Sequence, residues 1–115
     1  MKDDAVYLRH IAECIRRIEE NTAAGREQFF TSTALQDATL RNLQTMSEAT
    51  QRLSDGAKST HPETEWIRIG AFRNVLAHNY LGIDLALIWQ VIERDLPELK
   101  RAVVEMLQNL DDVNE

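Results

Sequence analysis

The sequence predicts an all-α protein, an antiparallel bundle of four to five helices. Apolar residues recur at three- and four-residue steps in several segments, which is the period of a helix that buries one face. Polar residues of the types that cap helices precede these segments, and glycines follow three of them. The 115 residues include only four Gly and two Pro, too few for the many tight turns of a β-fold.

The first helix is expected to run from the N-terminal acidic pair to shortly before Gly25. Asp3 or Asp4 can cap its start, and glycine commonly follows a helix end. The residues of its apolar stripe are Tyr7, Ile11, Cys14, Ile15 and Ile18. Cys14 has no second cysteine in the chain to pair with, and its place in this stripe predicts a side chain that packs as a small hydrophobe.

The second helix is expected over residues 33–54, between a capping box and a glycine. Thr33 and Gln36 have the capping-box spacing, and Gly56 lies just past the end. The residues near its apolar face are Leu35, Ala38, Asn42, Met46, Ala49 and Leu53. The connections before and after it, residues 21–32 and 55–64, are expected to be short polar loops.

The third helix is expected to begin between residues 61 and 66, after a second candidate capping box at 60–63, and to end near Gly82. Asp84 can cap the next segment, and residues 84–110 form either two helices or one helix kinked at Pro97. The tail at 110–115 is expected to fray. The larger aromatic side chains are expected to anchor the core or a subunit interface; they are Trp66, Phe72 and Trp89.

The composition limits the classes of function. With 43% hydrophobic and 28% charged residues, the chain is typical of one globular domain, here residues 1–115. No apolar run approaches the ~20 residues of a membrane span, and the N-terminus lacks the pattern of a secretory signal, so a soluble, cytoplasmic protein is expected. A net charge of −6 argues against broad adhesion to nucleic acid, so any contact with RNA must be local.

An arginine, an asparagine, a histidine and a tyrosine crowd into one otherwise apolar segment, RNVLAHNY at residues 73–80. The Arg73 guanidinium matches phosphate oxygens, and the His78 imidazole can transfer a proton near neutral pH. On a regular helix these two positions point about 140° apart, whereas Asn74 and His78 share a face. Convergence of Arg73 and His78 requires a wrapped arginine, a helix break near Gly82, or a second chain across a two-fold axis.

Two arginines and two histidines in one cleft could cleave RNA without a metal ion. One His78 would take the proton of a ribose 2′-hydroxyl, Arg73 would stabilise the charged transition state, and the partner's His78 would protonate the leaving oxygen. Asn74 could orient the imidazole. From spacing alone an alternative stays open, in which Arg73 and Asn74 are solvated, His78 caps a helix end and Tyr80 is a core or interface aromatic.

In its wider context this segment resembles the HepT-like toxins of the HEPN ribonuclease superfamily, over about residues 38–100. The family motif is an arginine, four residues, a histidine, one residue and a tyrosine, which here are Arg73, His78 and Tyr80. Further similar residues are Trp66, Asp84, Trp89 and the Leu-Pro-Glu-Leu at 96–99. Where the family commonly has Gly-Glu-Ala, this chain has Ser47-Glu48-Ala49, whose serine is still small enough for close helix packing.

The resemblance implies a homodimeric, metal-independent endoribonuclease, encoded beside an MntA-type minimal nucleotidyltransferase antitoxin. It also implies that the antitoxin silences the toxin by transferring AMP from ATP to the motif tyrosine, which makes Tyr80 the expected acceptor. ATP and Mg²⁺ would serve only the partner enzyme, and cleavage itself would need no cofactor. An added nucleotide phosphate near Arg73 would occupy the space that an RNA phosphate needs.

Several other interpretations remain open at this point. The chain could be a non-catalytic helical-bundle partner of a nucleotidyltransferase. His10 and Cys14 lie one turn apart, but two ligands are too few for a metal site. His61 is expected to be a solvated loop residue. Arg68, and Arg16 or Arg17 if the first helix lies alongside, could add positive charge at the cleft, although none is assigned to the site.

Overall fold

The computed structural model describes residues 2–78, 82 and 84–113. Four main helical segments make up this part of the chain: α1 (Lys2–Thr22), α3 (Thr33–Arg52), α5 (Trp66–His78), and a last run of α6 (Leu85–Gln90), the π-helical turn η1 (Val91–Asp95) and α7 (Leu96–Val113). Two short helices, α2 (Arg26–Thr31) and α4 (Asp55–Ser59), occupy the connections. The all-α prediction is confirmed, and the described residues contain no strand.

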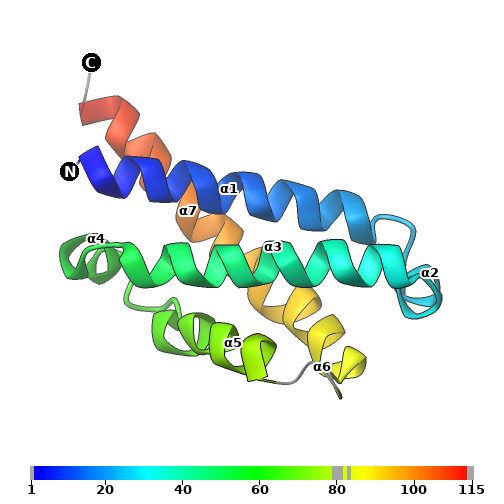
Figure 1. Cartoon of the computed structure of the whole chain (residues 1–115). Helices are drawn as coiled ribbons and strands as arrows, with labels where there is room; N and C mark the ends of the chain where they lie inside the picture. The colour runs from blue at the N-terminus through cyan, green and yellow to red at the C-terminus, as the bar shows by residue number, and fades with distance from the viewer. Residues whose placement is uncertain (1, 79–81, 83, 114–115) are drawn as a thin grey trace.

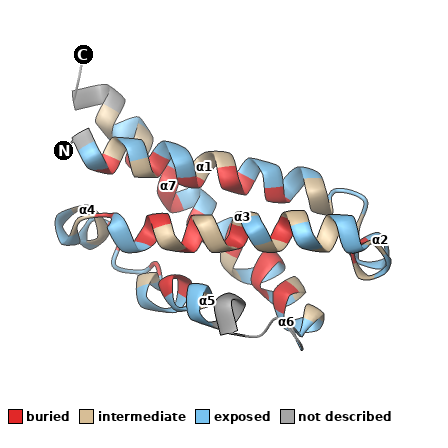
Figure 2. Ribbon diagram, viewed as in Figure 1, coloured by how far each residue is buried: buried red, intermediate tan, exposed pale blue. Residues whose placement is uncertain are grey.

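Three of the helices lie side by side, with α3 in the middle. Figure 1 shows α1, α3 and α5 in antiparallel order, and the last helical run crossing behind them. The close contacts are α1 with α3, α3 with α5, and α1 with α7. The buried residues recur along the inward faces of these helices (Figure 2); they include Leu8, Ile11, Ile15, Ile18, Leu43, Met46, Leu99 and Val103. No helix in the described residues is long and apolar enough to cross a membrane.

The apolar stripe predicted for the first helix forms one wall of this core. Ile11 and Ile18 are completely buried, and Cys14 is 2% exposed. Burial raises the pKa of the Cys14 thiol, which therefore stays protonated at neutral pH. The prediction that Cys14 packs as a small hydrophobe is confirmed.

Residues 21–32 were expected to be a polar loop, and this expectation is wrong. Gly25, at φ +101°, turns the chain through a conformation that side chains disfavour, and α2 begins directly after it. This turn lets α2 insert Phe29, which is completely buried and meets Trp89 edge to face at 5.4 Å between ring centroids. The aromatic pair joins α2 to α6 through the core.

The start of α3 lies where the sequence placed it, but the capping residue is different. The N-cap is Ser32, whose hydroxyl accepts a hydrogen bond from the Leu35 amide. The Gln36 side chain does not complete a capping box. Its amide instead donates to the carbonyl oxygens of Phe29 and Phe30, which satisfies the exposed end of α2 and fixes α2 against α3.

The second connection, residues 55–64, is also more ordered than a polar loop, and His61 is not solvated. Its side chain is buried, with Nδ1 3.0 Å from the Thr60 hydroxyl and Nε2 2.9 Å from a Glu105 carboxylate oxygen on α7. The His61 carbonyl also accepts a hydrogen bond from the Trp66 indole at 3.1 Å. The histidine was misassigned because its partner Glu105 lies 44 residues away in sequence.

The last helical run resolves the choice left open at Pro97. The chain stays helical from Leu85 to Val113, but a π-turn precedes the proline, with the Leu96 amide bonded to the Val91 carbonyl. Proline has no amide hydrogen to donate, and the wider turn absorbs this break without ending the helix. Asp84 caps the run as predicted, accepting from the amides of Ala86 and Leu87. The last helix, α7, includes residues 110–113.

Asp4 stabilises a contact between two distant segments rather than capping α1. Its carboxylate accepts hydrogen bonds from the Ser54 amide at 2.9 Å and the Ser54 hydroxyl at 2.7 Å. Burial opposes ionisation of Asp4, but the bonds from Ser54 outweigh it and lower the pKa of Asp4 below its ordinary value of 3.8. The start of α1 is thereby tied to the turn between α3 and α4.

Replacement of Asp4 by alanine is expected to lower the free energy of unfolding at pH 7 by about 1–3 kcal/mol, because the Ser54 amide loses its acceptor. A lowered folded pKa means that this stabilisation is complete above pH 4 and is lost as the pH falls through the folded pKa. Urea denaturation at pH 7 and pH 3 measures the effect. The matched control is the exposed neighbour, Asp3→Ala, for which a change within about 0.5 kcal/mol is expected. An Asp4→Ala deficit that is equal at both pH values would contradict the assignment.

Candidate active site

The motif segment lies at the end of α5. Arg73 and Asn74 are exposed on this helix, and His78 is its last residue. The helix is continuous through both Arg73 and His78, so their backbone positions differ in direction by about 140°, as the spacing predicted. The side chain of His78 and the whole of Tyr80 lie outside the described residues.

The inward face of α5 holds the helix against α3. Ile69 is 3% exposed, and the Trp66 indole donates to the carbonyl oxygens of Lys58 and His61. Gly70 lies against the Gln51 side chain of α3, since a Cβ there would be 3.0 Å from Gln51 Cγ. The Gln51 side-chain amide donates to the Gly70 carbonyl at 3.1 Å. These contacts set the rotation of α5, and so determine which of its residues are exposed.

An ion pair connects the motif to α3. Arg73 Nε lies 3.5 Å from Glu48 Oε1, and both side chains are about half exposed. Glu48 approaches Arg73 at Nε, and the guanidinium stays half exposed, so it is accessible to a phosphate. Ser47, next to Glu48, is completely buried, in keeping with the small residue expected there.

Sequence reasoning noted Glu48 only as part of a family pattern and gave it no role. Its pairing with Arg73 depends on the docking of α5 on α3, which joins residues 25 positions apart in sequence. Gln51 was not singled out at all. The signal that could have found both is their spacing, since Glu48 and Gln51 are three residues apart and share one face of α3.

Apolar side chains are exposed on the outward face of α5, ahead of the motif. Ile67 is 92% exposed, the exposed Ala71 follows one turn later, and the polar Asn74 continues the same face. On α6, which follows the motif, Leu87 is also 43% exposed. A helix that is apolar on both faces commonly buries the second one against another helix or another chain.

The other arginines considered for the cleft are engaged elsewhere. Arg68 lies 3.4 Å from carboxylate oxygens of both Glu65 and Asp95. Burial raises the pKa of Asp95, although the positive charge of Arg68 opposes the rise. The charge of Arg68 is thus balanced within its own surroundings.

Arg16 and Arg17 belong to α1, which lies alongside α3 rather than α5 (Figure 1). Both donate to the Glu13 carboxylate, and Arg16 also pairs with Glu20. The hydrogen bonds from Arg16 and Arg17 lower the pKa of Glu13 to about 2. These two arginines do not flank the motif, so the expectation that either could reach a cleft at α5 directly is not met.

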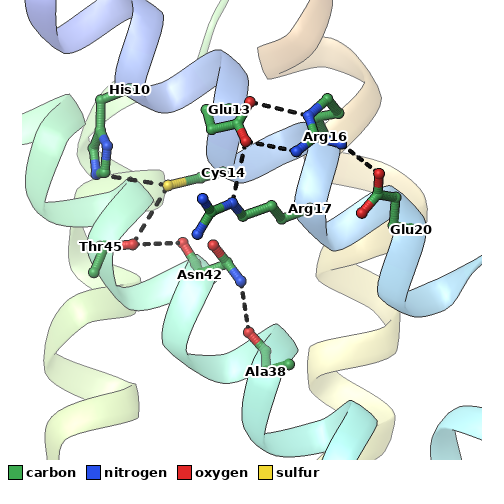
Figure 3. A network of polar contacts seen from close by, with 9 residues as sticks. All are labelled: His10, Glu13, Cys14, Arg16, Arg17, Glu20, Ala38, Asn42 and Thr45. Carbon is green, nitrogen blue, oxygen red and sulfur yellow. Dashed lines mark hydrogen bonds and ion pairs between the residues drawn. The ribbon is translucent and has the colours of Figure 1, made fainter.

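His10 and Cys14 do lie together, as Figure 3 shows, with 3.6 Å between Sγ and the imidazole Nε2. Cys14 Sγ is also 3.4 Å from the Thr45 hydroxyl on α3. The described part of the chain brings together no group of three His, Cys, Asp or Glu side chains that could hold a metal ion. The pair forms the floor of a hollow between α1 and α3.

Comparison with known proteins identifies the family. The model of the family described as Ribonuclease HepT-like matches residues 11–106. The chain belongs to this family. The all-α bundle is thus that of a HepT-like HEPN protein.

Three relatives span most of the HepT-like chain. A protein of Methanocaldococcus jannaschii named as a gamma-glutamylcyclotransferase and "putative RNase" is 37% identical over 96% of this chain, which spans 50% of that relative's length. A "putative RNase" of Caldanaerobacter subterraneus subsp. tengcongensis is 34% identical, with 94% of this chain and 97% of the relative covered. A "probable ribonuclease HepT" of Thermococcus cleftensis is 36% identical, with coverages of 82% and 86%. No solved structure matches with comparable significance.

Proposed function

We propose that the chain is a metal-independent endoribonuclease that acts as a homodimer and is the toxin of a HepT/MntA toxin-antitoxin pair. The observation that carries the proposal is the surface of α5. It presents Arg73, whose guanidinium is half exposed and accessible to a phosphate, and on another face the exposed apolar side chain of Ile67. The ribonuclease names of three relatives that cover most of the chain support the assignment of RNA as substrate.

A second copy of the chain provides a way to bring an arginine and a histidine to one phosphate. Two α5 helices that pack through their outward apolar faces bury Ile67 and place both motifs beside a two-fold axis. The 140° between the positions of Arg73 and His78 on one helix is then no obstacle, because the two groups at a phosphate come from different protomers.

The proposed reaction is an internal transesterification. One His78 takes the proton of a ribose 2′-hydroxyl, and that oxygen forms a bond to phosphorus. The bond from phosphorus to the 5′-oxygen breaks, and the partner's His78 supplies a proton to the leaving oxygen. Arg73 stabilises the charge on the phosphoryl oxygens, and Asn74, one turn from His78, orients the imidazole.

This chemistry leaves a characteristic pair of ends on the products. Single-stranded RNA incubated with the purified protein and EDTA is expected to be cut into fragments with a 2′,3′-cyclic phosphate and a 5′-hydroxyl, because no metal-bound water takes part. Mass spectrometry of the fragments identifies the ends. Cleavage that stops with EDTA and returns with Mg²⁺, or that yields a 5′-phosphate, would rule out the mechanism.

Tyr80 is proposed as the acceptor of AMP from the nucleotidyltransferase antitoxin. After incubation with the neighbouring nucleotidyltransferase, ATP and Mg²⁺, the intact protein is expected to gain the mass of adenylyl groups and to lose RNA cleavage, since the added phosphate competes for Arg73. The Tyr80→Phe variant removes only the acceptor oxygen and should gain no mass. Equal labelling of both proteins would place the modification elsewhere.

The alternative is a non-catalytic partner of the nucleotidyltransferase, a possibility favoured by the net charge of −6. Growth of cells that produce the chain alone separates the two functions. A nuclease toxin arrests growth and is rescued by its partner gene, whereas a binding module leaves growth normal.

A further inference from the structure

A second polar surface lies outside the motif, in a groove between α1 and α3. Two adjoining hollows form it, with volumes of about 220 and 200 Å³, and they share His10 and Thr45. The full lining comprises Tyr7, His10, Glu13, Cys14 and Arg17 of α1, and Arg41, Asn42, Thr45, Glu48, Ala49 and Arg52 of α3. All of these residues come from the two helices that run antiparallel in the front of Figure 1.

Each helix contributes one stripe of side chains to the groove. On α3 the stripe is Arg41, Thr45, Glu48 and Arg52, at steps of four, three and four residues, which keeps them on one face over about 16 Å. The α1 stripe, from Tyr7 to Arg17, has the same helical spacing. Arg41 and Arg52 therefore stand at the two ends of the α3 stripe, with the Thr45 hydroxyl and the Glu48 carboxylate between them.

The centre of the groove is polar and uncharged. Figure 3 shows Cys14 at the base between the His10 imidazole and the Thr45 hydroxyl, with Asn42 one turn along α3 from Thr45. Burial of the Cys14 thiol keeps it protonated, so it adds no negative charge. The Glu13 carboxylate at the rim is held by two arginines.

The groove also leads to the proposed active site. Glu48 lines the hollow that also contains Arg52, and its carboxylate pairs with Arg73 of α5. Within the described residues, neither Arg41 nor Arg52 has a carboxylate oxygen within ion-pair distance, in contrast to Arg68 and Lys100. Arg41 and Arg52 thus stand towards the two ends of the groove on α3, and Arg73 of α5 meets α3 between them at Glu48.

We propose that the groove between α1 and α3 binds the sugar-phosphate backbone of single-stranded RNA and guides the strand to Arg73. This inference rests on the proposed ribonuclease function. Arg41 and Arg52 contact phosphates, the hydroxyl and amide groups of Thr45 and Asn42 contact the sugar-phosphate chain, and the Tyr7 ring offers a surface on which a base can stack. Binding in this groove accounts for local RNA binding by an acidic protein, because the arginines are concentrated along the groove.

The test measures binding of a fluorescent 2′-O-methyl RNA, which has no free 2′-hydroxyl and cannot be cleaved. The groove variant is Arg41→Gln with Arg52→Gln, and the matched control is Arg94→Gln with Arg101→Gln, which removes the same charge from exposed positions on the last helical run. The groove variant is expected to bind about tenfold or more weakly. The plot of log K against log salt should become shallower by roughly 1.4, because two phosphate contacts are lost at about 0.7 each in a single strand. The control should keep the slope of the unmodified protein.

Three outcomes would overturn the inference. The first is an equal loss in both double variants, which would indicate a net-charge effect; the second is no loss in the groove variant; the third is binding of polyglutamate as tightly as RNA.

A cleavable dinucleotide, too short to reach the groove, separates this inference from the proposed function. If the unmodified protein cleaves the dinucleotide and the groove variant does so at the same rate while failing to bind the longer RNA, both proposals stand. If no RNA is cleaved but the groove variant still loses RNA affinity, the ribonuclease proposal fails and the groove keeps its role in RNA binding.

Discussion

Replacement of His78 by alanine is expected to reduce RNA cleavage by about 10²–10⁴-fold, the usual contribution of a general acid or base. Replacement of Arg73 by alanine is expected to cost about 10²–10³-fold, because one stabilising charge on the transition state is removed. Both values refer to kcat/KM on single-stranded RNA in the presence of EDTA. Circular dichroism and size-exclusion chromatography on the same samples verify that each variant keeps its helices and its oligomeric state.

Glu48→Gln is the informative control for Arg73. It removes the carboxylate that approaches Nε but leaves the guanidinium in place, so a change of only several-fold in kcat/KM is expected. The effect on stability should be within about 1 kcal/mol, since the ion pair is half exposed. Full cleavage by Arg73→Ala and His78→Ala proteins that remain folded would remove both residues from the reaction.

The largest effect on stability is expected at Phe29. Its replacement by alanine should lower the free energy of unfolding by about 3–5 kcal/mol, because a completely buried ring is lost and a cavity is left beside Trp89. Urea denaturation followed by circular dichroism provides the measurement.

The adjacent phenylalanine serves as a matched control, with the same chemical change in the same short helix. Phe30 is only partly buried and lies under the Arg26 guanidinium, 4.9 Å from its ring centroid. Phe30→Ala is therefore expected to cost about 1 kcal/mol, mostly from the loss of the cation–π contact. Equal losses at Phe29 and Phe30 would show that α2 is not anchored through the core.

The main helices could be predicted because their signals are local. The Gly25 stop, the Asp84 cap and the stripe from Ile11 to Ile18 each depend on residues within a few turns, and all three are confirmed. The choice at Pro97 was left open because two separate helices and one kinked helix both accommodate the amide hydrogen that proline lacks. The π-turn is selected by packing that keeps Ile92 and Leu96 on the buried face.

The errors fall where a side chain finds its partner far along the sequence. His61 was expected in solvent and is buried against Glu105, and Asp4, one of two candidates for a helix cap, binds Ser54. In both cases a polar residue in a polar segment gives no local sign of burial. Phe29 also finds a partner far along the sequence, because its ring packs against Trp89 of α6.

The sequence by itself determined the helical class, the order of the main helices, the position of the motif from Arg73 to Tyr80, and the family to which these residues point. Helical periodicity and the order of motif residues are properties of neighbouring positions, so they can be read from the amino-acid sequence alone. Only the tertiary structure decided that Glu48 meets Arg73, that Arg16 and Arg17 lie away from α5, and that Arg41 and Arg52 share one groove. Those relations depend on which faces of α1, α3 and α5 pack together, and packing is decided by the whole core at once.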